Sequence, residues 1–122
     1  MPERTPVVRR LRLPAPREDV WRALTNADLL SSWLGEVLEL EPRPGGAVTV
    51  RERDGSSRRG LVERVEPSRS LVFRWRRLAG TGGSLQVGEA TRVAFELEDE
   101  GDGTLLTVTE EPTPLVASGG GP

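Results

Sequence analysis

The sequence has no cysteine and no histidine among its 122 residues, and all 17 of its basic residues are arginines. Lysine and tyrosine are therefore missing as well. These absences exclude a disulfide, a thiolate nucleophile, a Schiff-base lysine, an imidazole base and a zinc site of His and Cys. Carboxylates are the only groups left for proton transfer, and we expect neither a metal nor another cofactor.

Long apolar runs are missing too, since the longest ones span only a few residues. A membrane-spanning helix needs about 20 apolar residues. Residues 1–12 carry charge without an apolar core behind them, unlike a secretory signal. We therefore expect a cytoplasmic protein that does not enter a membrane.

An excess of charge of one sign is likewise absent. The formal net charge is -2 and the pI is about 5.3. A surface that binds nucleic acid needs a positive excess, so we expect no nucleic-acid partner. With 35% hydrophobic and 30% charged residues, a chain of this length fits one folded domain.

Two short helices are predicted in the first third of the chain. Val20, Trp21 and Leu24 fall on one helical stripe, which predicts a helix that ends before Asn26. Asn26 is a favourable N-cap for a second helix, and Gly35 is suited to close it.

Alternation of apolar and polar residues predicts one strand before these helices and about six antiparallel strands after them. Its clearest stretches are residues 7–13, 38–41, 48–51, 59–65, 71–76, 92–97 and 104–109. Residues 78–91 contain irregularly spaced glycines and are predicted to form a loose connection, with at most a fragment of an edge strand at residues 85–87. Residues 111–122 are rich in Pro and Gly and are predicted to be a frayed tail after a single domain at residues 1–110.

Several stretches share a pattern of core and turn residues that is typical of one family. These stretches are residues 16–34, 60–75 and 92–110. The residues most typical of the pattern are Val20-Trp21, Leu24-Thr25, Trp33-Leu34-Gly35, Leu71 to Trp75 and Gly103-Thr104. The sequence resembles the activator-of-heat-shock-protein-90-ATPase homologue family, a branch of the START-like (SRPBCC) superfamily. The resemblance covers nearly all of residues 7–110 and identifies a fold better than a reaction.

This resemblance implies an α+β helix-grip (START/Bet v-like) fold, in which a curved antiparallel sheet wraps a long C-terminal helix and leaves an apolar cavity. The sequence departs from the family after Glu110, where it offers a Pro- and Gly-rich tail. We therefore expect the curved sheet and the two short N-terminal helices without the long C-terminal helix.

Loss of that helix would leave an apolar row on the sheet uncovered. The row consists of Leu71, Phe73, Trp75, Val93, Phe95, Leu97, Leu106 and Val108. Each large apolar side chain left in water forgoes roughly 1.5 to 3 kcal/mol of burial. We therefore expect self-association, or docking of a partner helix, on this face.

The inward-facing side chains also predict a pocket for a lipid-like or aromatic ligand, because such pockets are mostly apolar. We place Trp33 at its mouth, and the predicted wall consists of Leu38, Val48, Val50, Leu61, Phe73, Trp75, Phe95 and Leu97. The alternative is that these residues are plain core, since alternation reports burial and does not report a void.

Charged residues supply one further candidate. Glu63 shares the parity of Leu61 and Val65, so a desolvated carboxylate there could act as an acid or base. Alternatively, a bulge turns it to water or an arginine pairs with it. The remaining charges predict a solvated outer surface, in which arginines alternate with Glu39, Glu41, Glu52, Glu96 and Glu98.

Together, the residues and the resemblance predict a noncatalytic START-like module that binds a hydrophobic small molecule in a cavity on the concave face of the sheet. The alternative is a protein-interaction module, similar to chaperone activators, that docks through the uncovered sheet face as a homo-oligomer or with a partner protein. A weaker alternative is a carboxylate-dependent cyclase or dehydratase, which rests on Glu63 alone.

Overall fold

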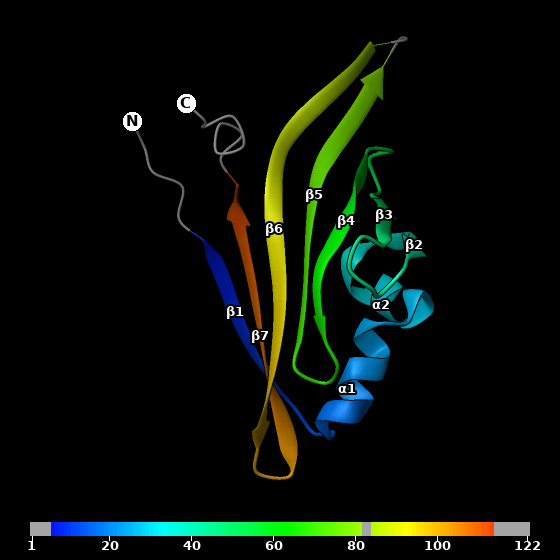
Figure 1. The fold of residues 1–122 in the computed structure, drawn as a ribbon. Coiled ribbons are helices and arrows are strands. Elements are labelled where there is room, and N and C mark those ends of the chain that lie inside the picture. Colours follow the sequence, from blue (N-terminus) through cyan, green and yellow to red (C-terminus); the bar gives the residue numbers. More distant parts are fainter. Residues whose placement is uncertain (1–5, 82–83, 114–122) are drawn as a thin grey trace.

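The structure is a computed structural model that describes residues 6–81 and 84–113, apart from the side chains of residues 33, 34 and 79–89. Within these ranges the chain forms one seven-stranded antiparallel sheet and two helices (Figure 1). The elements are β1 (Val7–Leu13), α1 (Arg17–Leu24), α2 (Ala27–Leu34), β2 (Glu36–Leu40), β3 (Ala47–Arg51), β4 (Ser57–Glu66), β5 (Ser70–Thr81), β6 (Ser84–Glu100) and β7 (Gly103–Pro112). The predicted α+β class and order of elements are confirmed.

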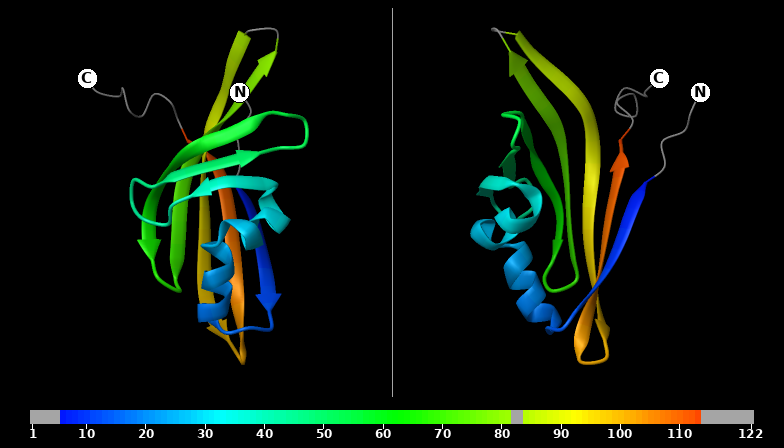
Figure 2. Two further views of the ribbon diagram at one scale, coloured as in Figure 1. Left: turned by 90° about the vertical axis from the view of Figure 1, so that its right-hand side faces the viewer. Right: turned by 180° about the vertical axis from the view of Figure 1, so that it is seen from behind.

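The sheet runs in the order β1-β7-β6-β5-β4-β3-β2, so the first strand pairs with the last. Each of the other strands pairs with its neighbour in sequence, as short antiparallel connections favour. The sheet curves, and both helices lie on its concave side (Figure 2). They cover the half of that side nearest the β6–β7 turn.

Local signals in the sequence account for the helix ends. Pro16 stands in extended conformation before α1, which carries Glu18 and Asp19 in its first turn, where the helix dipole favours negative charge. The Asn26 side chain accepts hydrogen bonds from the backbone N–H groups of Asp28 and Leu29, at 2.9 and 3.1 Å. Gly35 follows α2 with a φ of 107°, a value that favours glycine.

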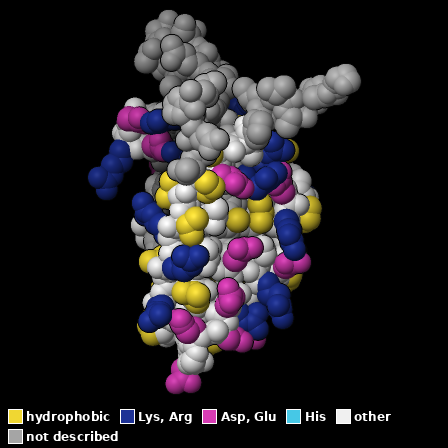
Figure 3. Space-filling model, turned by 90° about the vertical axis from the view of Figure 1, so that its left-hand side faces the viewer, with side chains coloured by type: hydrophobic (Ala, Val, Ile, Leu, Met, Phe, Trp, Pro, Cys, Tyr) yellow, Lys and Arg dark blue, Asp and Glu magenta, His cyan; other side chains and the backbone are white. Residues whose placement is uncertain are grey.

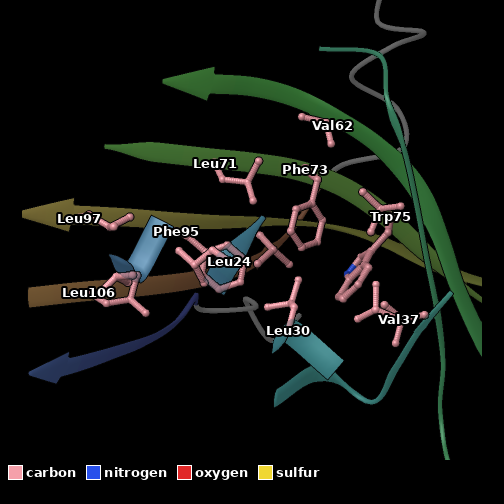
Figure 4. Packing of buried hydrophobic residues seen from close by; sticks show 14 residues of the cluster. Leu24, Leu30, Val37, Val62, Leu71, Phe73, Trp75, Phe95, Leu97 and Leu106 are labelled. Carbon is pink, nitrogen blue, oxygen red and sulfur yellow. The ribbon is translucent and has the colours of Figure 1, made fainter. Parts of the chain in front are cut away.

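The core lies between the helices and the concave face. Leu24 and Leu30 reach from α1 and α2 toward the sheet, where they join a cluster of buried strand residues (Figure 4). Val20 of α1 belongs to the same cluster. Leu71, Phe73 and Leu106 have exposed fractions of 0%. The expectation that the apolar row is left uncovered is therefore wrong for most of its members, because the two helices and the curvature of the sheet bury them. Val108 alone stays half-buried.

Two predicted boundaries also need correction. Residues 78–91 are largely regular, since β5 continues to Thr81 and β6 begins at Ser84, with Leu78 opposite Val87. Glycines do not prevent backbone pairing. Their irregular spacing interrupts the alternation of apolar and polar residues, so the sequence pattern did not predict this long hairpin.

The second corrected boundary is the end of the sheet. β7 reaches Pro112, and the N–H of Thr113 donates to the carbonyl of Ala90 at 3.0 Å. The rest of the predicted tail, residues 114–122, lies outside the described residues.

No helix follows β7 within the described part of the chain, which ends at Thr113. The described helices are also too short, and not apolar enough, for any of them to cross a membrane.

Candidate functional site: a cleft on the concave face

A cleft of about 250 Å³ opens on the concave face, lined by residues other than those of the two helices. Side chains from β1, β4, β5, β6 and β7, together with the residue after β3, form its lining. They are Val7, Arg9, Glu52, Arg58, Trp75, Val93, Phe95, Val108 and Glu110. The cleft therefore has an apolar wall and a charged end.

Strand register explains why these side chains meet. Val93 on β6 lies opposite Glu110 on β7, and Phe95 lies opposite Val108. Partners in an antiparallel pair point to the same side of the sheet, so all of these side chains reach the concave face. On β1, Arg9 lies opposite Val108 and extends the same surface to the sheet edge.

The charged end is organised around Arg58. Its Nε lies 3.0 Å from Oε1 of Glu52, and its Nη1 donates to Oε2 of Glu110 at 3.1 Å. The Nε contact is an ion pair without hydrogen-bond alignment, because Nε makes no hydrogen bond among the described residues. Thr91 Oγ1 also donates to Oε2 of Glu110, at 3.3 Å. Two carboxylates thus compensate one guanidinium in a half-buried setting.

Trp75 connects the charged end to the apolar wall. The Arg58 guanidinium carbon lies 5.1 Å from the centre of the indole ring, a cation–π distance. Phe73 contacts the same indole edge-on, with ring centres 4.8 Å apart. Trp75 is 5% exposed, and its Nε1–H finds no acceptor among the described residues. A buried donor without an acceptor costs free energy.

Most of the predicted wall residues face the concave side. Val48, Val50, Phe73, Trp75, Phe95 and Leu97 are buried there, but only Trp75 and Phe95 line the cleft. The other four are core residues. Trp33 belongs to α2, and its side chain lies outside the described residues.

The inward placement predicted for Leu38 and Leu61 is wrong. These side chains are 46% and 56% exposed, on the outer side of the sheet. The register shifts between Val37 and Glu39 in β2, and a similar shift interrupts β4 beside Glu63. A bulge inserts one residue and reverses the alternation. The inward residues are therefore Val37 and Val62 before the bulges and Leu40 and Val65 after them, which leaves Leu38 and Leu61 outside.

Glu63 lies on the outer side for the same reason, and its predicted inward position is wrong. One of its carboxylate oxygens is 3.3 Å from Nε of Arg74, and the other accepts from Nε of Arg92 at 2.9 Å. Figure 3 shows arginines and acidic side chains interspersed over the outer face of the sheet. Glu63 is therefore part of a solvated, ion-paired surface and not of the cleft.

The charged residues of the cleft are the ones that sequence reasoning missed. Glu52 was assigned to the outer surface, although it shares the parity of Val48 and Val50 and is 23% exposed at its side chain. Glu110 likewise shares the parity of Leu106 and Val108. If the alternation of inward-facing residues is continued by two positions, past Val50 and past Val108, it places both carboxylates on the concave face.

A second hollow, of about 370 Å³, lies between the two helices and the end of β1. It is lined almost wholly by apolar side chains, among them Leu13, Val20, Ala23, Leu29 and Leu30. Its polar lining residues are Asp19 and Ser32, and among the described residues it lacks the opposed charges of the cleft.

A curved antiparallel sheet that holds two short helices on its concave side, with a cleft beside them, defines an α+β protein of the helix-grip, START-like type. Residues 14–118 match the family model described as "Activator of Hsp90 ATPase homolog 1-like protein". The chain belongs to this family, which confirms the resemblance seen in the sequence. No curated protein matches the chain.

Solved structures agree with this assignment. MLL2253 from Mesorhizobium loti is 25% identical, with a TM-score of 0.75 over 95% of this chain and 85% of that one. CalU16 from Micromonospora echinospora is 28% identical, with a TM-score of 0.61 over 94% of this chain and 73% of its own. DynU16, a protein in the dynemicin biosynthetic locus, is 28% identical with a TM-score of 0.71, and the match covers 93% of this chain but 39% of DynU16.

Proposed function

We propose that the protein is a noncatalytic module that binds a hydrophobic small molecule in the concave cleft. The observation that carries this proposal is the wall of Trp75, Val93, Phe95 and Val108, with charged groups confined to one end. Ligand sites combine mostly apolar walls with a few polar anchors and usually measure about 300–1,000 Å³. A cleft of about 250 Å³ suits a ligand of one or two rings, or one that protrudes into solvent.

The charges in the cleft favour binding over proton transfer. Glu52 and Glu110 both contact Arg58, so neither carboxylate is poised as an unpaired base. Glu63, on which the cyclase or dehydratase alternative rested, is paired with arginines on the other side of the sheet. The location of DynU16 in a biosynthetic locus supports a small molecule as the ligand class. A cytoplasmic location remains part of the proposal.

Binding can be tested with a panel of fatty acids, flavonoids and polyketide-like aromatics. We expect at least one class to quench tryptophan fluorescence saturably and to raise the melting temperature. At a ligand concentration of 100 times Kd, mass action stabilises the folded state by about 2.7 kcal/mol. A flat response across the panel would refute the proposal.

A matched pair of variants locates the site. Val108→Trp fills the cleft with an indole and should abolish the response, because Val108 lines it. Leu38→Trp places the same indole on the outer side of the sheet, where Leu38 is 46% exposed, and should preserve the response. Equal behaviour of the two variants would place the ligand elsewhere.

A second candidate function is interaction with another chain, through the edge strand β1 and not through the sheet face. Val7, Val8 and Leu11 are 55%, 45% and 38% exposed on this strand. Among the described strands it pairs with β7 alone. Edge strands present unpaired N–H and C=O groups to other chains. Light scattering across a concentration series should then show a dimer, and a monomer at every concentration would count against self-association.

A further inference from the structure

A third hollow, of about 480 Å³, lies on the outer face of the sheet, which is the side away from the cleft. Its lining includes three arginines, Arg59, Arg74 and Arg76, and one carboxylate, that of Glu63. The lining therefore has an excess of two positive charges, although the formal net charge of the whole chain is -2. A local positive excess in a hollow attracts anions.

Strand register places the three guanidinium groups on one face. Arg59 on β4 lies directly opposite Arg76 on β5. Arg74 is two residues before Arg76 on the same strand, so it shares that face. Directly opposed residues of an antiparallel pair have Cβ atoms about 4.5–5.5 Å apart, and like charges at such positions repel each other.

Among the opposed arginines of this face, one pair is compensated by a carboxylate and another is not. Arg74 lies opposite Arg92 on β6, and Glu63 contacts both of them, at 3.3 Å from Nε of Arg74 and 2.9 Å from Nε of Arg92. Arg59 and Arg76 form no ion pair with a carboxylate of the described residues. Their repulsion is left for solvent or a bound anion to offset.

The side chains that would hold an anion are open to solvent. Arg59, Arg74 and Arg76 are all exposed. Leu61 lies opposite Arg74, lines the same hollow and is 56% exposed. A molecule that enters the hollow therefore meets guanidinium groups and an apolar side chain without any rearrangement of the sheet.

A phosphate group fits this set of side chains better than a carboxylate does. Each guanidinium presents its N–H donors in a planar fork that matches two phosphate oxygens. A phosphate monoester carries about -1.5 to -2 charges at pH 7 and so offsets the excess of two positive charges. A carboxylate supplies only one negative charge. Leu61 adds an apolar contact that an organic substituent on the phosphate can use.

We infer that this hollow binds the dianion of a phosphate monoester. Arg59 and Arg76 donate hydrogen bonds to the phosphate oxygens, and Leu61 contacts the organic part. Arg74 contributes positive charge from a position held by Glu63. The site lies on the face of the sheet away from the cleft, so the inference is independent of the proposed function.

Phenyl phosphate serves as the probe, titrated into the full-length protein at low ionic strength while the backbone amide resonances are followed by NMR. We expect saturable binding, with the largest shifts at residues 59–61 and 74–76. Benzoate has the same ring and a single charge, and it should bind roughly 10-fold more weakly. Inorganic phosphate has the charge without the ring and should bind roughly 3-fold more weakly.

Single substitutions locate the site. Arg59→Gln and Arg76→Gln each remove one guanidinium and should weaken the binding of phenyl phosphate roughly 10-fold. Arg10→Gln removes the same charge from an exposed position on β1 that does not line the hollow, and it should leave the affinity unchanged. Glu63→Gln should tighten binding, because the carboxylate then no longer competes for Arg74.

Equal weakening by Arg10→Gln and Arg76→Gln would indicate nonspecific attraction and would overturn the site. A lack of saturable binding by the unchanged protein would do the same. Benzoate that binds as tightly as phenyl phosphate would overturn the dianion class. Inorganic phosphate that binds as tightly as phenyl phosphate would overturn the contact with Leu61.

Discussion

The concave face of the sheet has two halves that are built from the same strands and differ in what lies over them. In the helix-covered half, Leu71, Phe73 and Leu106 pack against side chains of α1 and α2 and are fully buried. In the cleft half, the same strands present Trp75, Val93 and Val108 together with Arg58 and Glu110. A cleft remains where neither α1 nor α2 lies over the sheet, and polar groups are tolerated there because water or a ligand can reach them.

The largest contrast should appear between two residues of β7 that face the same side. Leu106→Ala removes a side chain with 0% exposure and should lower the free energy of unfolding by about 3 kcal/mol. Val108→Ala, in the cleft half, should lower it by about 1 kcal/mol or less, because Val108 is half-buried and borders open space. Urea denaturation of both variants measures the difference, and equal losses would mean that the two halves are packed alike.

Gly60 allows a test of how Trp75 is held. It lies opposite Trp75 in the β4–β5 pair, and a Cβ atom there would collide with the Arg74 carbonyl oxygen and the Trp75 Cα. Gly60→Ala should therefore force the strands to shift, at a cost of about 1–3 kcal/mol, and should weaken ligand binding. The neighbouring exposed side chain gives the control: Arg59→Ala should change stability by about 0.5 kcal/mol or less. Full stability of Gly60→Ala would contradict the close approach.

Two carboxylates on opposite sides of the sheet give a smaller contrast. Glu110 in the cleft and Glu63 on the outer face each contact arginine side chains. Because these ion pairs are partly exposed, Glu110→Gln and Glu63→Gln should each cost about 1 kcal/mol or less. Only Glu110→Gln should alter the affinity for cleft ligands. A change in cleft-ligand affinity with Glu63→Gln would indicate that the outer face of the sheet takes part in binding.

The smallest effect concerns Asp54, at the margin of the cleft half. Hydrogen bonds donated by the Ser56 hydroxyl and by the Ser56 backbone N–H, helped by Arg77, hold the pKa of the Asp54 carboxyl below its ordinary value of 3.8. A lowered folded-state pKa stabilises the protein above about pH 4 and loses that contribution as the pH falls through the folded-state pKa. Asp54→Asn should therefore differ from the unchanged protein at pH 7 and approach it at low pH. Parallel melting curves at both pH values would contradict this linkage.

Much of the fold could be predicted because its signals are local. Asn26 caps α2 and Gly35 closes it, as each residue type favours. The alternation from Leu71 to Trp75 gave the correct inward face of β5. Long-range features escaped prediction: the bulges beside Leu38 and Glu63 depend on pairing with distant strands, and no residue type requires them.

The candidate site divides in the same way. Trp75 and Phe95 were expected in the wall because their burial follows from alternation. The cluster of Glu52, Arg58 and Glu110 joins strands that are distant in sequence, and it is the strand order that brings these side chains together. The unpartnered N–H of Trp75 likewise depends on which neighbours surround the indole.

By itself, the sequence determined the kinds of element, their order and the chemistry that the protein lacks, because capping, alternation and composition act within a few residues. Tertiary structure alone decided that α1 and α2 bury one half of the concave face and leave a cleft over the other half. The reason is physical: burial depends on what packs against a side chain, and for Leu106 and Val108, two residues apart on one strand, that is settled by elements far away in the chain.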